Sequence, residues 1–168
     1  MINTVSIGKL IEDVVSEMAV TGLTINFEVG TTEQVVGELV KKDNSKTHKS
    51  KKYPLIALFT PIEVQKGGQF YGTAFIRRIT IAALSTQNKL VKDRYAVDGN
   101  FETILYPCYK EFLIRLCESE YVSEQEPNKI IHRLIEAPGV QEIPDTSDFV
   151  DCLHLDNLEF TILQQSKC

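Results

Sequence analysis

Two imidazoles and a thiol are the first side chains in this sequence that could do chemistry together. Cys152 and His154 lie two residues apart, and His132 lies twenty residues before Cys152. These groups can bind zinc, but structural zinc sites use four ligands in paired short-range motifs. In the alternating segment "DCLHLD" the cysteine and the histidine simply share one face of a strand. We therefore expect ordinary packing here, with no metal and no other cofactor.

A second group of polar residues lies in "KDRYAVDGNFE", which holds Asp93, Arg94, Asp98 and Glu102. Paired carboxylates can act as general acid and general base. The same charges are typical of a solvated loop and of the first turn of a helix, where the helix dipole favours acids. The sequence lacks the common dinucleotide, P-loop, serine-hydrolase and zinc-protease motifs. We expect a protein that is not an enzyme, with a small cytoplasmic enzyme using this segment as an alternative.

The most unusual feature is the basic segment "KKDNSKTHKSKK", residues 41–52, which contains six lysines and one aspartate. Its like charges repel, and its Asp, Asn, Ser and Thr side chains compete with helical hydrogen bonds, so the pattern predicts a mobile solvated loop. The segment lacks the interleaved aromatic residues that stack on single-stranded bases. A nucleic-acid backbone and an acidic protein surface are both candidate partners, and a nucleic-acid-binding module is a further alternative. The candidate contact residues are Lys46, Lys49, Lys51, Lys52, Arg77, Arg78 and Arg94.

Length and composition predict one folded domain that spans residues 1–168. The chain has 168 residues and 43% hydrophobic content, enough to bury one core. Its longest apolar runs are far shorter than a membrane span, and its first residues lack a signal-peptide pattern. We expect a cytoplasmic protein with no contact with a membrane.

Charge is distributed unevenly along the chain. The formal net charge is -5, although residues 41–52 alone carry +5. From Glu118 onward there are eleven acidic and three basic residues. Separated charges of this kind suit head-to-tail contact between copies of one protein, since a heterologous interface joins two unlike surfaces.

The first third of the chain predicts a helix, a strand and a second helix. Thr4 is a suitable N-cap for an amphipathic helix that extends to Ala19. The segment "LTINFEV", residues 23–29, alternates as a strand with one wet face. Thr31 and Gln34 then form a capping-box pattern for a short helix that ends before the basic segment.

The middle of the chain predicts an antiparallel hairpin over residues 53–84. "YPLIALFT" is continuously apolar, which is typical of a strand covered on both faces and near the sheet centre. "FYGTAFIRRITIAAL" is rich in β-branched and aromatic residues and is long for a strand. Arg77 and Arg78 should interrupt its apolar character on both faces, as in a strand that projects beyond the core.

The remaining segments complete an α+β fold. A helix should start near Asn100, bury a stripe from Phe101 to Leu116, and kink at Pro107. "IIHRLIEAPG" is a strand or irregular, and "LEFTIL", residues 158–163, is the last strand. The elements predict an α+β domain with a mainly antiparallel sheet, helices packed on one face and a long protruding β-hairpin.

Several segments together resemble small structural proteins of tailed bacteriophages. They are the amino-terminal helix, the "KYP" that precedes a buried strand, the long hairpin and the aromatic helix "NFETILYPCYKEFLIRL". The chain is similar to the tail-terminator and neck-ring, or head-tail joining, class. "YPLIALF", "LYPCYKEFL" and "DCLHLDNLEF" also resemble proteins from phages of gut Bacteroidota, including the crAss-like group.

This resemblance implies a virion structural protein that assembles in the host cytoplasm. The implied role is a ring-forming head-to-tail connector or tail-terminator-like subunit around the DNA channel. The implied partners are further copies of the chain and other phage neck or tail proteins, such as portal, adaptor and tail subunits. The basic segment would be a candidate for non-specific contact with packaged DNA, although the acidic final third does not suit a surface that grips DNA.

Overall fold

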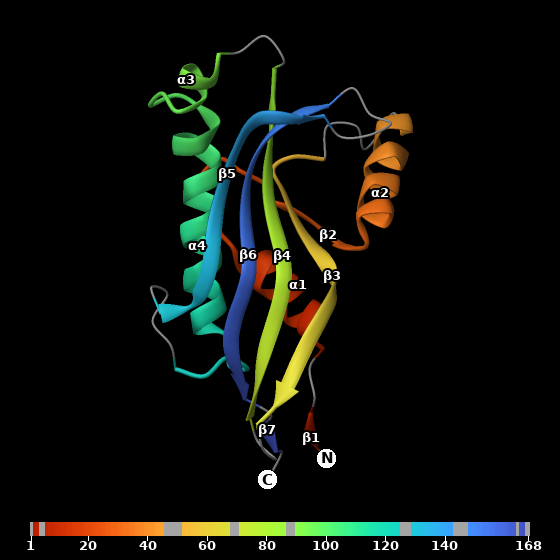
Figure 1. Cartoon of the computed structure of the whole chain (residues 1–168), viewed down its shortest axis with the longest axis vertical. Coiled ribbons are helices and arrows are strands. Elements are labelled where there is room, and N and C mark those ends of the chain that lie inside the picture. The colour runs from red at the N-terminus through yellow and green to blue at the C-terminus, as the bar shows by residue number, and fades with distance from the viewer. Residues whose placement is uncertain are drawn as a thin grey trace.

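The structure, a computed structural model, describes residues 2–3, 6–45, 52–67, 71–86, 90–124, 129–142, 148–163 and 165–166. Its centre is a five-stranded sheet (Figure 1). The strands, in spatial order, are β2 (Asn26–Gly30), β3 (Leu55–Lys66), β4 (Tyr71–Ser85), β6 (Phe149–Leu163) and β5 (Ile131–Glu142). β2 is parallel to β3, and the other neighbouring pairs are antiparallel. The predicted α+β class with a mainly antiparallel sheet is confirmed.

Helices flank this sheet, and two short strands lie beside it. The helices are α1 (Ile7–Glu17), α2 (Thr32–Asn44), α3 (Val91–Arg94), the π-helical turn η1 (Phe101–Leu105) and α4 (Tyr106–Glu118). The short strands β1 (Ile2–Asn3) and β7 (Gln165–Ser166) pair with each other. Within the described ranges, no helix combines the length and the apolar character that a bilayer crossing requires.

One face of the sheet packs against α1, η1 and α4, and we call these three elements the helical layer. Ile56 and Leu58 of β3 point to this side and meet Ile11 of α1 and Phe112 of α4 in the main core. α1 begins after Ser6, whose side-chain oxygen accepts a hydrogen bond from the Lys9 backbone N–H. The helix therefore starts two residues later than the N-cap predicted at Thr4, which lies outside the described residues.

The opposite face of the sheet is only partly covered, and we call it the open face. Leu55 and Ala57 of β3 point to this side and form a second, smaller core with Val35 and Leu39 of α2. The four residues Leu55 to Leu58 are all buried, so the prediction of a strand covered on both faces is confirmed. Because α2 packs here, helices lie on both faces of the sheet. The prediction that the helices pack on one face is therefore wrong.

The basic segment is partly helical and partly buried. The predicted capping box of Thr31 and Gln34 is present, and α2 then continues to Asn44 instead of ending before Lys41. Lys52 is 5% exposed, and its ammonium group contacts the carboxylates of Asp43 and Asp148. The prediction of a mobile loop over residues 41–52 is therefore wrong at both ends of that range. Residues 46–51 lie outside the described part of the chain.

The predicted hairpin pairs as expected. β3 and β4 are antiparallel over their length, from Leu55 opposite Ala82 to Lys66 opposite Gly72. Residues 68–70, which connect the strands, lie outside the described part, so the protrusion of this hairpin stays a prediction. β6 begins at Phe149, nine residues before the strand predicted from "LEFTIL". The long helix changes from π to α geometry at Tyr106, next to Pro107, where a break was predicted.

Candidate interaction site

The alternation of inward and outward side chains is interrupted in the middle of two adjacent strands. In β4, Ile76 and Ile79 both belong to the main core, so two residues separate them where regular pleating would place one. In β6 the same spacing separates Leu155 from Leu158. The intervening residues all line one cavity on the open face; they are Arg77, Arg78, Asp156 and Asn157. Asn157 has a φ of 54°, a left-handed conformation that asparagine tolerates better than most residues.

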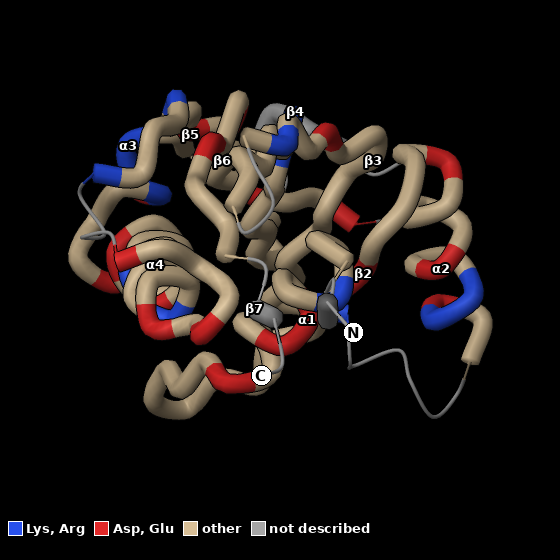
Figure 2. Tube along the Cα trace, turned by 90° about the horizontal axis from the view of Figure 1, so that it is seen from below, with Lys and Arg blue, Asp and Glu red and all other residues tan. Residues whose placement is uncertain are grey.

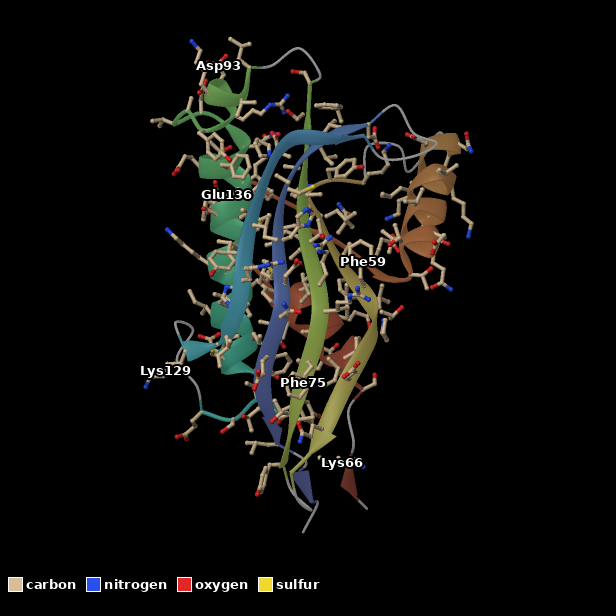
Figure 3. All side chains as sticks on the ribbon, viewed as in Figure 1. Phe59, Lys66, Phe75, Asp93, Lys129 and Glu136 are labelled. Carbon is tan, nitrogen blue, oxygen red and sulfur yellow. The ribbon has the colours of Figure 1, made fainter. Side chains whose placement is uncertain are left out.

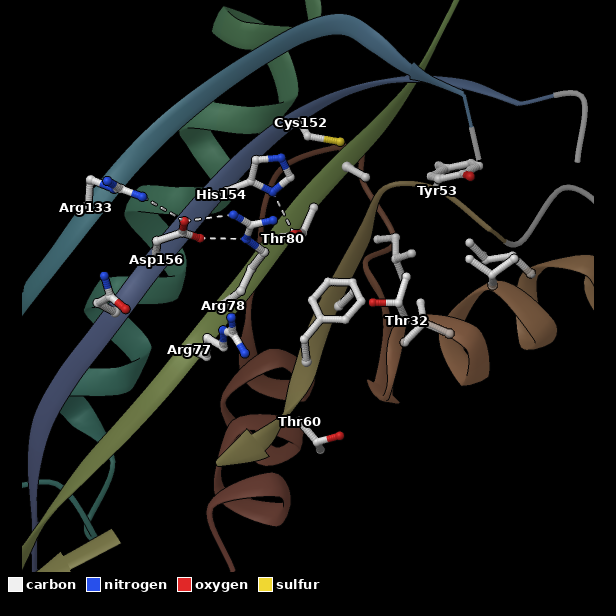
Figure 4. Close-up of a pocket in the computed structure, with 18 residues that line it drawn as sticks. Thr32, Tyr53, Thr60, Arg77, Arg78, Thr80, Arg133, Cys152, His154 and Asp156 are labelled. Atoms are coloured by element: carbon white, nitrogen blue, oxygen red, sulfur yellow. Dashed lines mark hydrogen bonds and ion pairs between the residues drawn. The ribbon is translucent and has the colours of Figure 1, made fainter. Parts of the chain in front are cut away.

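Because the alternation is interrupted here, the predicted placement of Arg77 and Arg78 is wrong. Regular alternation would send Arg77 and Arg78 to opposite faces, and the sequence predicted that they interrupt both. Instead the two side chains lie together on the open face (Figure 4). Register shifts at the same level in β3, after Phe59, and in β5, after Ile131, extend the irregularity across the sheet. The sheet therefore concentrates positive charge where a regular one would divide it.

The cavity on the open face has a volume of about 900 Å³. Its floor is the sheet, and the first turns of α2 form one wall, from which Thr32 and Val36 line it. Arg133 of β5 and His154 of β6 lie on the other side (Figure 4). Of the charged residues that line the cavity, three are arginines and one is an aspartate, Asp156. The cavity is therefore cationic, and we call it the arginine cavity.

Arg78 and Asp156 form the central ion pair of the arginine cavity. Arg78 donates to Asp156 through Nε at 2.7 Å and through Nη2 at 2.8 Å, the two-pronged geometry that suits a guanidinium and a carboxylate. Arg133 contacts the same carboxylate more distantly, at 3.4 Å, and its side chain is 69% exposed. Hydrogen bonds from Arg78 lower the pKa of Asp156 below its ordinary value. The carboxylate of Asp156 is therefore occupied mainly by Arg78. The guanidinium groups of Arg77 and Arg133 can still donate most of their hydrogen bonds to another molecule.

His154 supplies a neutral, buried polar group beside the arginines. Its Nδ1 lies 2.8 Å from the hydroxyl of Thr80, which stands opposite it on β4. Its Nε2 is buried and has no hydrogen-bond partner among the described residues. Burial lowers the pKa of His154, and the positive charge of Arg78 lowers it further, so the ring is neutral near pH 7. Neighbouring Cys152 is also buried, which raises the pKa of its thiol to about 12 and makes it a packing residue.

A second surface, on the far side of the helical layer, is acidic. Residues 6–25 and 100–124 together hold eight acidic and three basic residues. Arg115 of α4 pairs with Glu111 at 2.8 Å and with Glu118 at 2.9 Å. These contacts raise the pKa of Arg115, and the negative charge of Glu17 also raises it. Figure 2 shows acidic positions gathered along α4 and beside α1. The residues that we call the acidic patch surround Arg115 and Tyr121; they are Asp13, Glu17, Glu111, Glu118 and Glu120.

Two residues of the acidic patch contradict the electrostatics of their own helices. Glu17 is the last residue of α1, and Glu118 is the last residue of α4. The carboxyl end of a helix carries partial negative charge, so a cation is favoured there and an acid is disfavoured. The last turn of α1 contains no basic residue. The ion pair with Arg115 offsets this cost for Glu118, so Glu17 is the residue that breaks the local rule without such a partner, as is expected where a protein binds something.

Three of the basic residues predicted to contact other molecules form ion pairs within the chain. Lys52 pairs with Asp148, Arg94 with Asp151, and Arg78 with Asp156. Each pair joins a basic residue to an acid of the final third of the chain. The contrast between a basic segment and an acidic final third is therefore partly cancelled internally. The unlike surfaces that remain are the arginine cavity and the acidic patch.

Arg94 is a structural residue and not a contact residue. It is 2% exposed, and its Nη1 donates to Asp151 at 2.6 Å while Nη2 donates to the Thr86 carbonyl at 2.8 Å. Its guanidinium also lies over the ring of Phe149. These contacts fasten α3 to the sheet, so the prediction of Arg94 as a partner contact is wrong. The same holds for Lys52, which is buried.

The other candidate residues are placed as follows. Lys46, Lys49 and Lys51 lie outside the described residues. Asp93, Asp98 and Glu102 are exposed and do not line the arginine cavity. Figure 3 places Asp93 at one end of the molecule and Lys66 towards the other.

The three side chains considered as metal ligands, Cys152, His154 and His132, lie on different faces of the sheet. Cys152 and His154 both line the arginine cavity on the open face. His132 lies 2.7 Å from the hydroxyl of Tyr109 on α4, on the side of the helical layer. The three side chains therefore do not converge on one ion.

Sequence reasoning missed Arg133, His154, Thr80 and Asp156 as members of one site. The doubled polar positions, Arg77 with Arg78 and Asp156 with Asn157, were the available signal, because two consecutive polar residues inside an apolar strand indicate a change of pleat. No protein-family model matches this chain, and no curated protein matches it significantly.

Proposed function

We propose that the protein is a structural subunit that associates head to tail into a closed ring, and that this ring belongs to the neck or tail of a bacteriophage virion. The supporting observation is that unlike charges lie on opposite layers of one molecule. The arginine cavity opens on the sheet, and the acidic patch lies on the helices behind it. Two unlike surfaces on one subunit give a heterologous contact, which closes into a ring when the rotation between subunits allows it.

Association explains these features more simply than catalysis does. A catalytic site needs a nucleophile, acid or base whose pKa is tuned towards neutrality. In the arginine cavity the thiol of Cys152 has its pKa raised to about 12, and Asp156 is held ionised by Arg78. Neither group is poised to exchange a proton near pH 7, and the ring nitrogen of His154 that has no partner among the described residues, Nε2, is buried. We propose on this ground that the protein acts by binding and not by catalysis.

The virion role rests on the similarity of several segments to tail-terminator and neck-ring proteins. Such a subunit surrounds the path of DNA, and an acidic surface facing a channel would repel the DNA backbone and let it slide. The acidic patch is a candidate for such a lining only where the neighbouring subunit leaves it uncovered. Adjacent portal, adaptor or tail proteins would contact the ring at its two rims.

The first experiment measures the mass of the purified protein in solution. Light scattering coupled to size-exclusion chromatography should give a discrete multiple of 19.0 kDa at low salt. High salt should shift the population towards monomer, since exposed charges are screened. Negative-stain electron microscopy of the same fractions should show closed rings. A monomer under every condition would refute self-association.

The second experiment tests the virion role separately. Virions whose genome encodes this chain are purified and analysed by mass spectrometry, and an antibody against the protein is used to label them. We expect the chain in the particle and the label at the head-tail junction or along the tail. Absence from purified virions, together with ring formation in solution, would retain the assembly and reject the phage location.

A further inference from the structure

We propose that the arginine cavity is the receptor half of the subunit interface and that it receives carboxylates from the acidic patch of a second copy of this chain. This inference rests on the proposed self-association and assigns its contact surfaces. The occupant is thus an acidic helix face of the same protein. Free anions, DNA and unrelated proteins are competing occupants that the test below separates.

The arginine cavity has the chemistry to bind carboxylates. Arg77 and Arg133 are not matched by further acids in the cavity, because Asp156 is already held by Arg78. Guanidinium groups bind carboxylates in a planar two-pronged geometry, as Arg78 does within the chain. The Nε2 atom of His154 is buried without a partner among the described residues, and it is a donor when the Thr80 hydroxyl donates to Nδ1. Incoming carboxylates would pair with the exposed guanidinium groups of Arg77 and Arg133.

The acidic patch matches the cavity in more than charge. Ile114 and Glu118 lie four residues apart and therefore share one face of α4, where the Glu118 side chain is 57% exposed. Ile114 is 41% exposed, which is unusual for a large apolar side chain on this helix. The cavity likewise combines arginines with an apolar wall that includes Val36 of α2 and Phe59 of β3. A helix face that carries carboxylates beside an isoleucine therefore complements a cavity that carries guanidinium groups beside valine and phenylalanine.

This interface would explain why acidic residues occupy the carboxyl ends of two helices. Glu17 and Glu118 are disfavoured by the dipoles of α1 and α4 in the isolated subunit. A neighbour's guanidinium groups would offset that cost, because charges that meet across an interface steer the encounter and fix its orientation. Glu17, Glu118 and Glu120 are all exposed, and the surface ion pair between Glu118 and Arg115 contributes little to stability, so these three residues can be changed to lysine without loss of folding. That property makes a charge-exchange experiment practicable.

The experiment uses two reciprocal variants of the full chain. In the first, Arg77→Glu with Arg133→Glu, both contact surfaces become acidic. In the second, Glu17→Lys with Glu118→Lys and Glu120→Lys, both become basic. Each variant alone should associate about 100-fold more weakly than wild type, since its two surfaces repel. An equimolar mixture should restore assembly, with the two variants alternating in a one-to-one ratio that native mass spectrometry can count.

A control matched to the variant with Arg77→Glu and Arg133→Glu carries the same change of formal charge elsewhere. Lys66→Glu with Lys92→Glu reverses two exposed lysines that belong to neither surface. This control should assemble as wild type does, which would exclude net charge as the cause. Circular dichroism and urea unfolding of every variant verify that each is folded before association is measured.

Three results would overturn the inference, and they are distinguishable. If wild type is monomeric throughout, the proposed function fails together with this interface. If wild type assembles but the arginine variant assembles equally well, or the mixture fails to restore assembly, self-association survives and this interface is rejected. If the arginine variant loses binding to a DNA duplex or to acetate while its assembly is unchanged, the cavity serves another occupant.

Discussion

Arg78 and Asp156 face each other across β4 and β6 and are joined by two hydrogen bonds of 2.7 and 2.8 Å. This pair is the fixed part of the arginine cavity, because it orients one guanidinium and occupies the only carboxylate that lines the cavity in the described structure. The arrangement leads to a prediction on stability and its dependence on pH.

Asp156→Asn should lower the free energy of unfolding by about 1–2 kcal/mol at about pH 7, because Arg78 loses an ionised partner while keeping some access to water. The folded-state pKa of Asp156 is depressed, so its contribution is present above the ordinary value of 3.8 and is lost as pH falls below it. Urea unfolding should show the full difference between wild type and variant at about pH 6 and a smaller one at about pH 3. A difference that grows on acidification would contradict this account.

Asn157 should tolerate glycine and reject a β-branched residue. Its φ of 54° lies in the left-handed region, where glycine is unstrained and valine is strongly disfavoured. Asn157→Gly should change the free energy of unfolding by less than about 0.5 kcal/mol, and Asn157→Val should lower it by about 1–3 kcal/mol. Thermal unfolding of both variants checks the order. Equal stability of the two would mean that the left-handed residue does not set the local pleat.

Gly139 should be intolerant of even a methyl group. It has a φ of 55°, and a Cβ at this position would lie 2.1 Å from the Cζ atom of Arg94. Gly139→Ala should therefore lower the free energy of unfolding by more than about 1 kcal/mol. Gly8→Ala is the control, because a methyl group at Gly8 in α1 would meet no neighbouring atom, and this change should gain about 0.5–1 kcal/mol. Chemical denaturation measures both changes, and a loss at both sites would argue against the clash.

Lys52 should behave as a buried structural residue. Burial disfavours its charge, but hydrogen bonds to Asp148 and Asp43 outweigh that effect and raise its pKa. Lys52→Met should lower the free energy of unfolding by about 2–4 kcal/mol, because two partly buried carboxylates lose their shared cation. The contribution is present below the ordinary lysine pKa of 10.5 and is lost as pH rises through the folded value, so a measurement near pH 7 records it in full.

The exposed Lys66 supplies the comparison for Lys52. It lies at the end of β3, where a methionine removes a solvated charge and little else. Lys66→Met should change the free energy of unfolding by less than about 0.5 kcal/mol. If the two lysine variants unfold alike, Lys52 does not bridge its carboxylates in solution.

Local patterns were sufficient to predict the elements that depend on local physics. Thr31 and Gln34 form a capping box because both partners lie within one helical turn. The apolar stripe from Phe101 to Leu116 is buried as its spacing indicates, and the α+β class follows from the order of the elements. Boundaries were less accurate, since α2 extends through Lys42 with support from the contact of that lysine with Glu28.

The candidate site could not be predicted because its members meet only through the sheet. Arg78 and Asp156 are separated by 78 residues in the chain, and Arg133 and Asp156 by 23. A count of charges along the chain cannot reveal that such residues neutralise each other. Strict alternation also failed at Arg77 and Arg78, because the rule assumes an unbroken pleat.

The interrupted pleat of β4 and β6 has an evolutionary consequence. A one-residue deletion within a strand is usually strongly destabilising, because every side chain beyond it moves to the opposite face of the sheet. Here the two strands carry matching extra residues, at Arg77 and at Asn157, which keep their registers aligned above and below that level. Relatives of this protein should therefore vary at these positions by substitution while keeping their length. Loss of one residue would be tolerated only when the facing strand loses its counterpart as well.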